Sequence, residues 1–277
     1  MKYYFSSTLV LWTLILSIPF TLQSQEERIS KGFDEGAAKF GITDADLIDR
    51  LMPIVEGVGG TARDMLQQQS VKPYMMPVRK VGAKGSDLSY ALASCLEYYV
   101  NLDKNYKLNL SPDYISLNIE NSGRRMTLLD AFQFLAHEGT VNAAIVPYEA
   151  SELTGAVYST QKFKINNYLH LFREVTPGRQ RVYEARKALM RGNPVLIELK
   201  ANESIKGLAN ASSLEPSING TQLYPLIVVG YDETRQAFEV MSCWGRNWGT
   251  DGYIWLSYDN FGQHAMNGYV MVPDGNY

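Results

Sequence analysis

The hydrophobic period of this chain changes near its middle, and this change restricts the possible folds more than any other feature. The run from Asp87 to Val100 contains no Gly or Pro, and its apolar residues recur at helical spacing. This pattern predicts a long core helix with Ser86 or Asp87 at its N-terminus. Further helices are predicted over Leu128–Glu138 and Arg181–Met190, each followed closely by a glycine.

The C-terminal part is typical of strands. Five short segments are rich in β-branched or aromatic residues and are separated by Gly, Asp and Asn: 195–199, 226–229, 238–241, 253–256 and 269–272. The stretch 201–223 between the first two is predicted to be a long polar loop. Helices followed by strands predict an α+β protein in which a helical lobe faces a β-lobe.

The N-terminus is typical of an exported protein. Lys2 precedes an apolar run from Leu9 to Phe20, which is shorter than the roughly 20 residues of a membrane-spanning helix. We therefore predict a signal peptide over residues 1–24, with an uncleaved anchor as the alternative. Residues 25–66 form a lead-in arm, and residues 67–277 form the main domain.

Within the arm, Leu47, Leu51 and Ile54 recur at helical spacing, and Thr43 is a candidate cap. Pro53 weakens the helical pattern near its end. The arm is expected to pack on the main domain, although a short peptidase prosegment would occupy the same place.

Charge and composition exclude several functions. The formal net charge of -3 offers no basic surface for nucleic acid. Three scattered histidines and two cysteines show no metal-ligand spacing, so we expect neither metal nor cofactor. Cys95 and Cys243 allow at most one disulfide, and small buried thiols are the favoured alternative.

Three segments, in order, carry the strongest functional signal. They are residues 81–92 (VGAKGSDLSYAL), 224–232 (YPLIVVGYD) and 242–256 (SCWGRNWGTDGYIWL). Together they resemble the nucleophile, general-base and W-G-x-x-W-G segments of papain-like (C1 family) cysteine peptidases. The resemblance covers roughly residues 71 to 272 and implies a papain-like two-lobed fold: a helical N-terminal lobe, a β-barrel-like C-terminal lobe and a groove between them.

The chain departs from that family where chemistry is needed. By position, Asp87 replaces the nucleophilic Cys, Tyr224 the general-base His, Ser242 the orienting Asn and Val81 the oxyanion Gln. A carboxylate at a helix N-terminus is a good cap and a poor nucleophile toward amides. A phenol stays protonated at neutral pH, and Val has no donor. We therefore expect a catalytically degenerate member, a pseudoenzyme with no catalytic residues.

Other residues offer weak substitutes. Cys243 adjoins the orienting position, where the family has a structural Ser, and His137, His170 and His264 all fall outside the base position. An Asp87–Tyr224 hydrogen bond is expected to lock the old active site shut.

The resemblance implies a protein- or polypeptide-binding scaffold in an envelope or secreted complex: periplasmic, outer-membrane-associated or extracellular, with no transmembrane segment once the signal is removed. The groove is expected to be lined by Met126, Thr127, Trp244 and Trp248. Met126 and Thr127 replace a glycine pair of the family and would crowd a bound strand, so a fixed partner is favoured over a peptide ligand. The alternatives are an active hydrolase with rearranged residues, with Cys243 as nucleophile, and a peptidase inhibitor.

Overall fold

A computed structural model describes residues 40–120, 126–214 and 220–275. Contacts divide the chain into Met1–Phe40 and Gly41–Tyr277, and the second unit is described below. The predicted signal peptide lies outside the described residues. Within the described residues, no helix is both long enough and apolar enough to cross a membrane.

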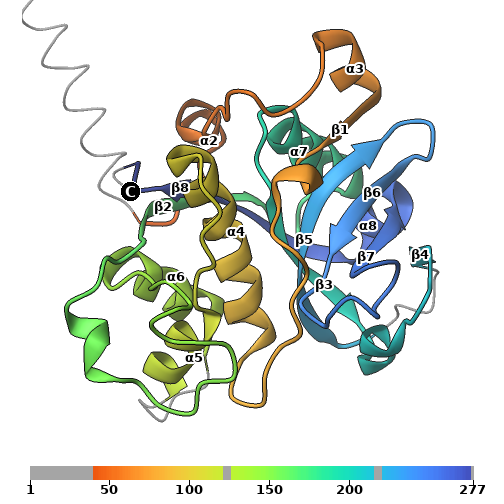
Figure 1. Ribbon diagram of the computed structural model, residues 1–277. Coiled ribbons are helices and arrows are strands. Elements are labelled where there is room, and N and C mark those ends of the chain that lie inside the picture. Colours follow the sequence, from red (N-terminus) through yellow and green to blue (C-terminus); the bar gives the residue numbers. More distant parts are fainter. Residues whose placement is uncertain (1–39, 121–125, 215–219, 276–277) are drawn as a thin grey trace, which may run out of the picture. The chain divides into compact units, whose positions relative to one another are not determined.

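Three helices form one side of the Gly41–Tyr277 unit, as Figure 1 shows. They are α4 (Asp87–Lys104), α5 (Pro112–Glu120) and α6 (Leu128–His137). Helix α4 contacts α5 on one side and strands of the sheet on the other, which explains why its buried positions extend around most of the helix. The predicted central helix is confirmed, with Ser86 as its N-cap and one more turn at its C-terminus.

The strands form one eight-stranded sheet in the order β2-β8-β3-β5-β6-β7-β4, with β1 paired to β5. Their bounds are β1 Gln68–Ser70, β2 Ile165–Phe172, β3 Val195–Ala201, β4 Ser213–Leu214, β5 Gln222–Asp232, β6 Ala237–Met241, β7 Tyr253–Ser257 and β8 Ala265–Pro273. All five predicted strands are present. Most extend beyond the predicted ends because ladder hydrogen bonds continue past the apolar positions.

Several elements differ from the prediction or were not predicted. Helix α7 (Gly178–Met190) begins one turn earlier than expected, and α8 (Tyr258–His264) follows β7 directly. Strand β2 arises from a mixed polar segment that pairs with β8. The predicted loop 201–223 contains the 3-10 helix η3 (Glu203–Gly207) and strand β4. Two further 3-10 turns, η1 (Lys72–Tyr74) and η2 (Gly155–Tyr158), complete the elements of the described residues.

The described part of the lead-in arm contacts the sheet through Ile42 and the short helices that follow it. Ile42 is 2% exposed, and its backbone exchanges hydrogen bonds with Tyr168 and His170 on β2. Two short helices follow, α2 (Ala45–Leu51) and α3 (Ala62–Gln67).

Two details of the arm differ from the sequence prediction. Asp44, not Thr43, caps α2, because its carboxylate accepts a hydrogen bond from the Leu47 amide at 3.0 Å. Ile54 is 76% exposed and lies outside the helix, which ends at Leu51 before Pro53.

Candidate functional site

The first turn of α4 is positioned by a tight turn and a cap. The Gly85 amide donates to the Gly82 carbonyl at 3.1 Å, which turns the chain just before the helix. A Cβ on Gly85 would meet the Tyr90 ring at 2.5 Å, so the turn needs a residue without a side chain. Ser86 then caps the helix through the Ser89 amide at 3.0 Å. This arrangement presents Asp87 at the helix N-terminus, where its negative charge is favoured.

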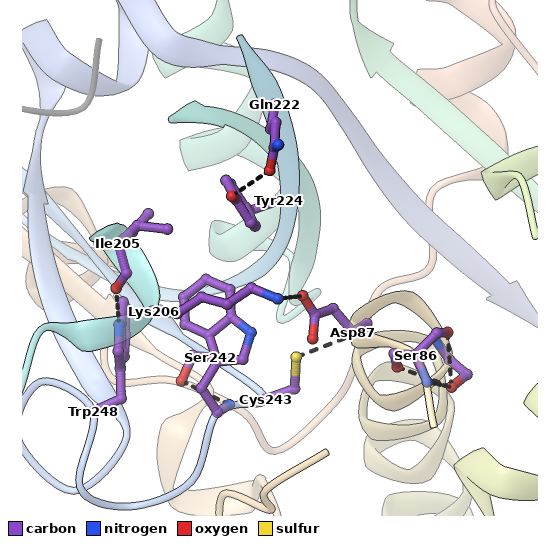
Figure 2. A network of polar contacts seen from close by, with 11 residues as sticks. Ser86, Asp87, Ile205, Lys206, Gln222, Tyr224, Ser242, Cys243 and Trp248 are labelled. Atoms are coloured by element: carbon purple, nitrogen blue, oxygen red, sulfur yellow. Dashed lines mark hydrogen bonds and ion pairs between the residues drawn. The ribbon is translucent and has the colours of Figure 1, made fainter. Parts of the chain in front are cut away.

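Asp87 is paired with a lysine from the other lobe. Figure 2 shows Lys206 of η3 extending toward the first turn of α4, where its Nζ lies 2.7 Å from the Asp87 carboxylate. Partial burial lowers the pKa of Lys206, but the hydrogen bond and charge of Asp87 outweigh it and raise that pKa overall. The side chains are 41% and 21% exposed, so the pair contributes at most about 1 kcal/mol.

Aromatic rings surround the Lys206 ammonium. Its Nζ lies 5.5 Å from the ring centroid of Tyr224 and 5.7 Å from that of Trp244. These two rings meet edge to face at 5.9 Å, and Trp244 meets Trp248 at 5.3 Å. The ring faces hold a cation at this position, in addition to the Asp87 carboxylate.

Tyr224, at the position of the family's general base, makes a different bond from the one expected. Its hydroxyl donates to the Gln222 Oε1 at 2.6 Å, and the residue is 4% exposed. The expected Asp87–Tyr224 hydrogen bond is therefore wrong. Lys206 instead connects the two residues, through an ion pair to Asp87 and a cation–π contact to Tyr224. The prediction failed because nothing in the local pattern of 201–223 indicated that a lysine would lie between them.

Ser242 and Cys243 lie at the end of β6, and both are buried. Ser242 Oγ accepts from the Trp244 amide at 3.3 Å, and the Cys243 thiol donates to the Asp87 carbonyl at 3.4 Å. Burial, followed by the charge of Asp87, raises the pKa of Cys243 well above its ordinary value. A buried protonated thiol of this kind is a weak nucleophile.

Val81 lies beside this pair without contributing a side-chain donor. Its backbone amide donates to the Cys243 carbonyl at 2.9 Å, so that N–H already has a partner. The half-buried valine side chain has only carbon atoms to present.

The four residues expected to line the groove differ in exposure. Thr127 is exposed and caps α6, and half-buried Met126 places its sulfur 3.6 Å from the Ser86 hydroxyl. Trp244 is half-buried. Trp248 is 2% exposed, so its side chain is enclosed in this structure.

Trp248 is covered by η3 and the residues that follow it. The indole Nε1 donates to the Ile205 carbonyl at 2.6 Å, and the Gly249 amide donates to the Leu208 carbonyl at 2.6 Å. These bonds attach η3 to the W-G segment, and the attachment places Lys206 over the site.

The histidines lie away from both thiols. His137 ends α6 and is exposed, and His264 ends α8. His170 bonds Asn267 at 3.1 Å and stacks on Tyr269. Cys95 is a buried free thiol on α4, and burial raises its pKa. Both cysteines are free and buried, as favoured from the sequence, and no hydrogen bond joins a thiol to an imidazole among the described residues.

A metal site was not expected, and the described residues contain no group of three or more His, Cys, Asp or Glu able to hold a metal ion.

The chain belongs to the papain family of cysteine proteases, whose family model matches residues 63–273. The predicted α+β papain-like fold is confirmed by solved structures. Xylellain, a cysteine protease from Xylella fastidiosa, superposes with a TM-score of 0.61 at 19% identity over 86% of this chain and 96% of its own. Digestive procathepsin L 3 of Tenebrio molitor superposes with a TM-score of 0.61 at 16% identity, over 90% of this chain and 88% of its own.

The curated relatives are longer than this chain, which matches only part of each of them. Procathepsin L of Rattus norvegicus is 26% identical over 68% of this chain and 58% of its own length. The gamete and mating-type specific protein A of Dictyostelium discoideum is 26% identical over 71% of this chain and 44% of its own length. The chain thus spans about half the length of the curated relatives it matches.

Proposed function

We propose that this chain is a noncatalytic papain-family protein that is exported and acts as a scaffold for a protein or polypeptide partner. The single observation that carries the proposal is the Asp87–Lys206 ion pair. It fills the position where the family resemblance places a nucleophile at the start of the central helix. A carboxylate that is paired with an ammonium is a poor nucleophile toward an amide.

The neighbouring groups support an inactive site. Acyl transfer needs a base to accept a proton and donors to hold the oxyanion. The Tyr224 hydroxyl donates to Gln222, and the Val81 amide donates to the Cys243 carbonyl. Both groups are therefore engaged in bonds within the fold. Loss of a single member of a catalytic set already lowers activity by orders of magnitude, so residual hydrolysis is not expected from four substitutions.

A scaffold role accounts for the retained fold. The Trp and Gly residues of the W-G segment pack and hydrogen-bond as structural parts, while the four chemical positions hold other residues. Because η3 covers Trp248 and Lys206 occupies the site, the partner is expected to bind the outside of the domain in preference to the old cleft. Export rests on the apolar run Leu9–Phe20, and sequencing the N-terminus of the mature protein tests it.

A cleavage screen tests the loss of activity. The purified chain is incubated with a broad peptide library at several pH values, beside a Cys243→Ser variant of the same preparation. We expect both to leave the library intact, whereas xylellain, assayed in parallel as a cysteine protease, cleaves it. Turnover by the wild-type chain that disappears in Cys243→Ser would overturn the proposal in favour of a rearranged hydrolase.

A second experiment tests the scaffold role. The tagged chain is cross-linked in its native envelope, and each cross-linked protein is then purified and titrated against the purified chain. We expect saturable binding that is unchanged when both thiols are blocked, since no covalent step is involved. If purified candidates bind no better than an unrelated exported protein, the scaffold proposal fails while the loss of activity stands.

A further inference from the structure

A hollow of about 580 Å³ lies outside the site described above and is lined by residues of α7, β3, α8 and β8. Its walls carry three groups that are positive or can become positive: Arg181 from α7, Lys200 from β3 and His264 from the end of α8. Gln263 and Thr221 add polar groups. This combination of donors and positive charge is what an oxyanion requires.

The cations of this hollow form no ion pair within the part of the chain that the structure describes. None of Arg181, Lys200 and His264 forms an ion pair with any described residue, whereas Lys206, Lys187 and Lys72 all do. The sole acidic residue among the described walls is Glu174, whose side chain is exposed and also forms no ion pair within the described structure.

Arg181 is the rigid part of the hollow. The residue is 7% exposed, and its guanidinium donates to the carbonyls of Thr176 at 2.7 Å, Ala265 at 2.8 Å and Glu174. These bonds fix the group, but carbonyl oxygens do not cancel its positive charge. Burial lowers the pKa of Arg181, and the charge of the exposed Glu174 opposes that shift.

Lys200 and His264 both line this hollow. Burial, and then the charge of Lys200, lowers the pKa of His264 below its ordinary value. Like charges facing one hollow are unfavourable unless something negative lies between them. A bound anion would relieve this repulsion and gain charge-assisted hydrogen bonds from Lys200 and a protonated His264.

We propose that this hollow is a binding site for an oxyanion, a carboxylate or phosphate group, with Lys200 and His264 as its principal ligands. The site is independent of the proposed scaffold function, because it shares no residue with the Asp87–Lys206 cluster.

The chain's three histidines make the test direct. Their ring signals are followed by NMR during titration with inorganic phosphate, and in parallel with a blocked di-glutamate peptide. We expect a saturable shift of His264 alone and a rise in its pKa, because a nearby anion favours the imidazolium. Tighter binding of phosphate indicates a free small anion, and tighter binding of the peptide indicates an acidic side chain of a polypeptide.

Two lysine variants distinguish phosphate binding in the hollow from general electrostatic attraction of phosphate to the protein. Lys200→Gln is expected to weaken phosphate binding about tenfold, through loss of a charge-assisted contact, and to raise the pKa of His264 in phosphate-free buffer. Lys107→Gln changes the net charge equally at an exposed position outside the hollow and is expected to leave both unchanged.

The proposal is overturned by any of three results. These are no saturable shift of His264 at tens of millimolar phosphate, equal shifts of all three histidines, or wild-type affinity in Lys200→Gln. The histidine spectra also report whether each variant is folded, so a misfolded variant is recognised.

Discussion

The Cys243 thiol donates a hydrogen bond to the backbone carbonyl of Asp87, 3.4 Å away. The sulfur is therefore directed at the first residue of α4, which by resemblance stands at the position of the family's nucleophile. It is nevertheless enclosed, since Cys243 is 5% exposed. This free thiol is thus a packed, weakly bonded group beside the first turn of α4.

The first prediction concerns thiol reactivity. Because burial and the Asp87 charge raise the pKa of Cys243, its thiolate forms only at higher pH than that of a free cysteine. In a Cys95→Ser variant, where Cys243 is the sole thiol, we expect iodoacetamide to react more slowly than with free cysteine at neutral pH. The rate should rise only in alkaline buffer, and denaturant should abolish the difference. Fast labelling of the folded chain near pH 7 would contradict the packed role.

The second prediction concerns the ion pair over the site. A double-mutant cycle of Asp87→Asn and Lys206→Gln, measured by urea unfolding, should give a coupling energy of about 0.2–1 kcal/mol, because the pair is partly exposed. The coupling should shrink in high salt. As a control, Arg246 and Asp251 form a more exposed pair, each 68% exposed, and should couple less. A coupling of zero for Asp87 and Lys206 would mean that the pair does not hold η3 over α4.

The third prediction compares two neighbouring tryptophans, of which one donates a hydrogen bond through its indole. The Trp248 indole donates to the Ile205 carbonyl, whereas the Trp244 indole nitrogen is buried without a partner among the described residues. Both lose the same volume on replacement by Phe. Trp248→Phe should therefore destabilise the chain by about 1–3 kcal/mol more than Trp244→Phe, because only the former leaves a buried carbonyl unpaired. Equal unfolding free energies in urea would show that the Trp248 bond does not secure η3.

The fourth prediction concerns Glu198 on β3, which accepts hydrogen bonds from Asn267 at 2.8 Å and Tyr269 at 3.3 Å. Burial raises the pKa of Glu198, and these two bonds oppose the shift without cancelling it. A carboxyl with a raised folded-state pKa binds more protons folded than unfolded, so it contributes stability at low pH that is lost as pH rises through that pKa.

A Glu198→Gln variant removes this dependence. We expect it to be more stable than the wild type at neutral pH, by less than about 1 kcal/mol, with the advantage disappearing toward pH 4. Urea unfolding between pH 4 and 8 measures the difference, and Glu203→Gln at an exposed position is the matched control. A constant difference at all pH values would show that the carboxyl does not titrate as argued.

Local pattern was enough to predict the main helices and strands. The uninterrupted run after Ser86 can only form a helix of several turns, and the apolar segments around Val195 and Val228 suit a buried sheet. By resemblance, motif spacing predicted Val81, Asp87, Tyr224 and Ser242 at the family's chemical positions. Asp87, Tyr224 and Ser242 lie around Lys206 in Figure 2, and the Val81 amide donates to the Cys243 carbonyl. Residue identity at those positions was available from the sequence alone.

Only the tertiary structure determined that η3 and its Lys206 cover that site. Residues 201–223 show polar, aperiodic composition, which says nothing about where their side chains go. Only when β3 and β5 pair and η3 docks on Trp248 does Lys206 come within 2.7 Å of Asp87, although 119 positions separate the two residues in the chain. The same reason applies to Lys200 and His264. Contacts between residues far apart in the chain depend on how the elements pack, and hydrophobic period records only which residues are buried, not which distant residue they will meet.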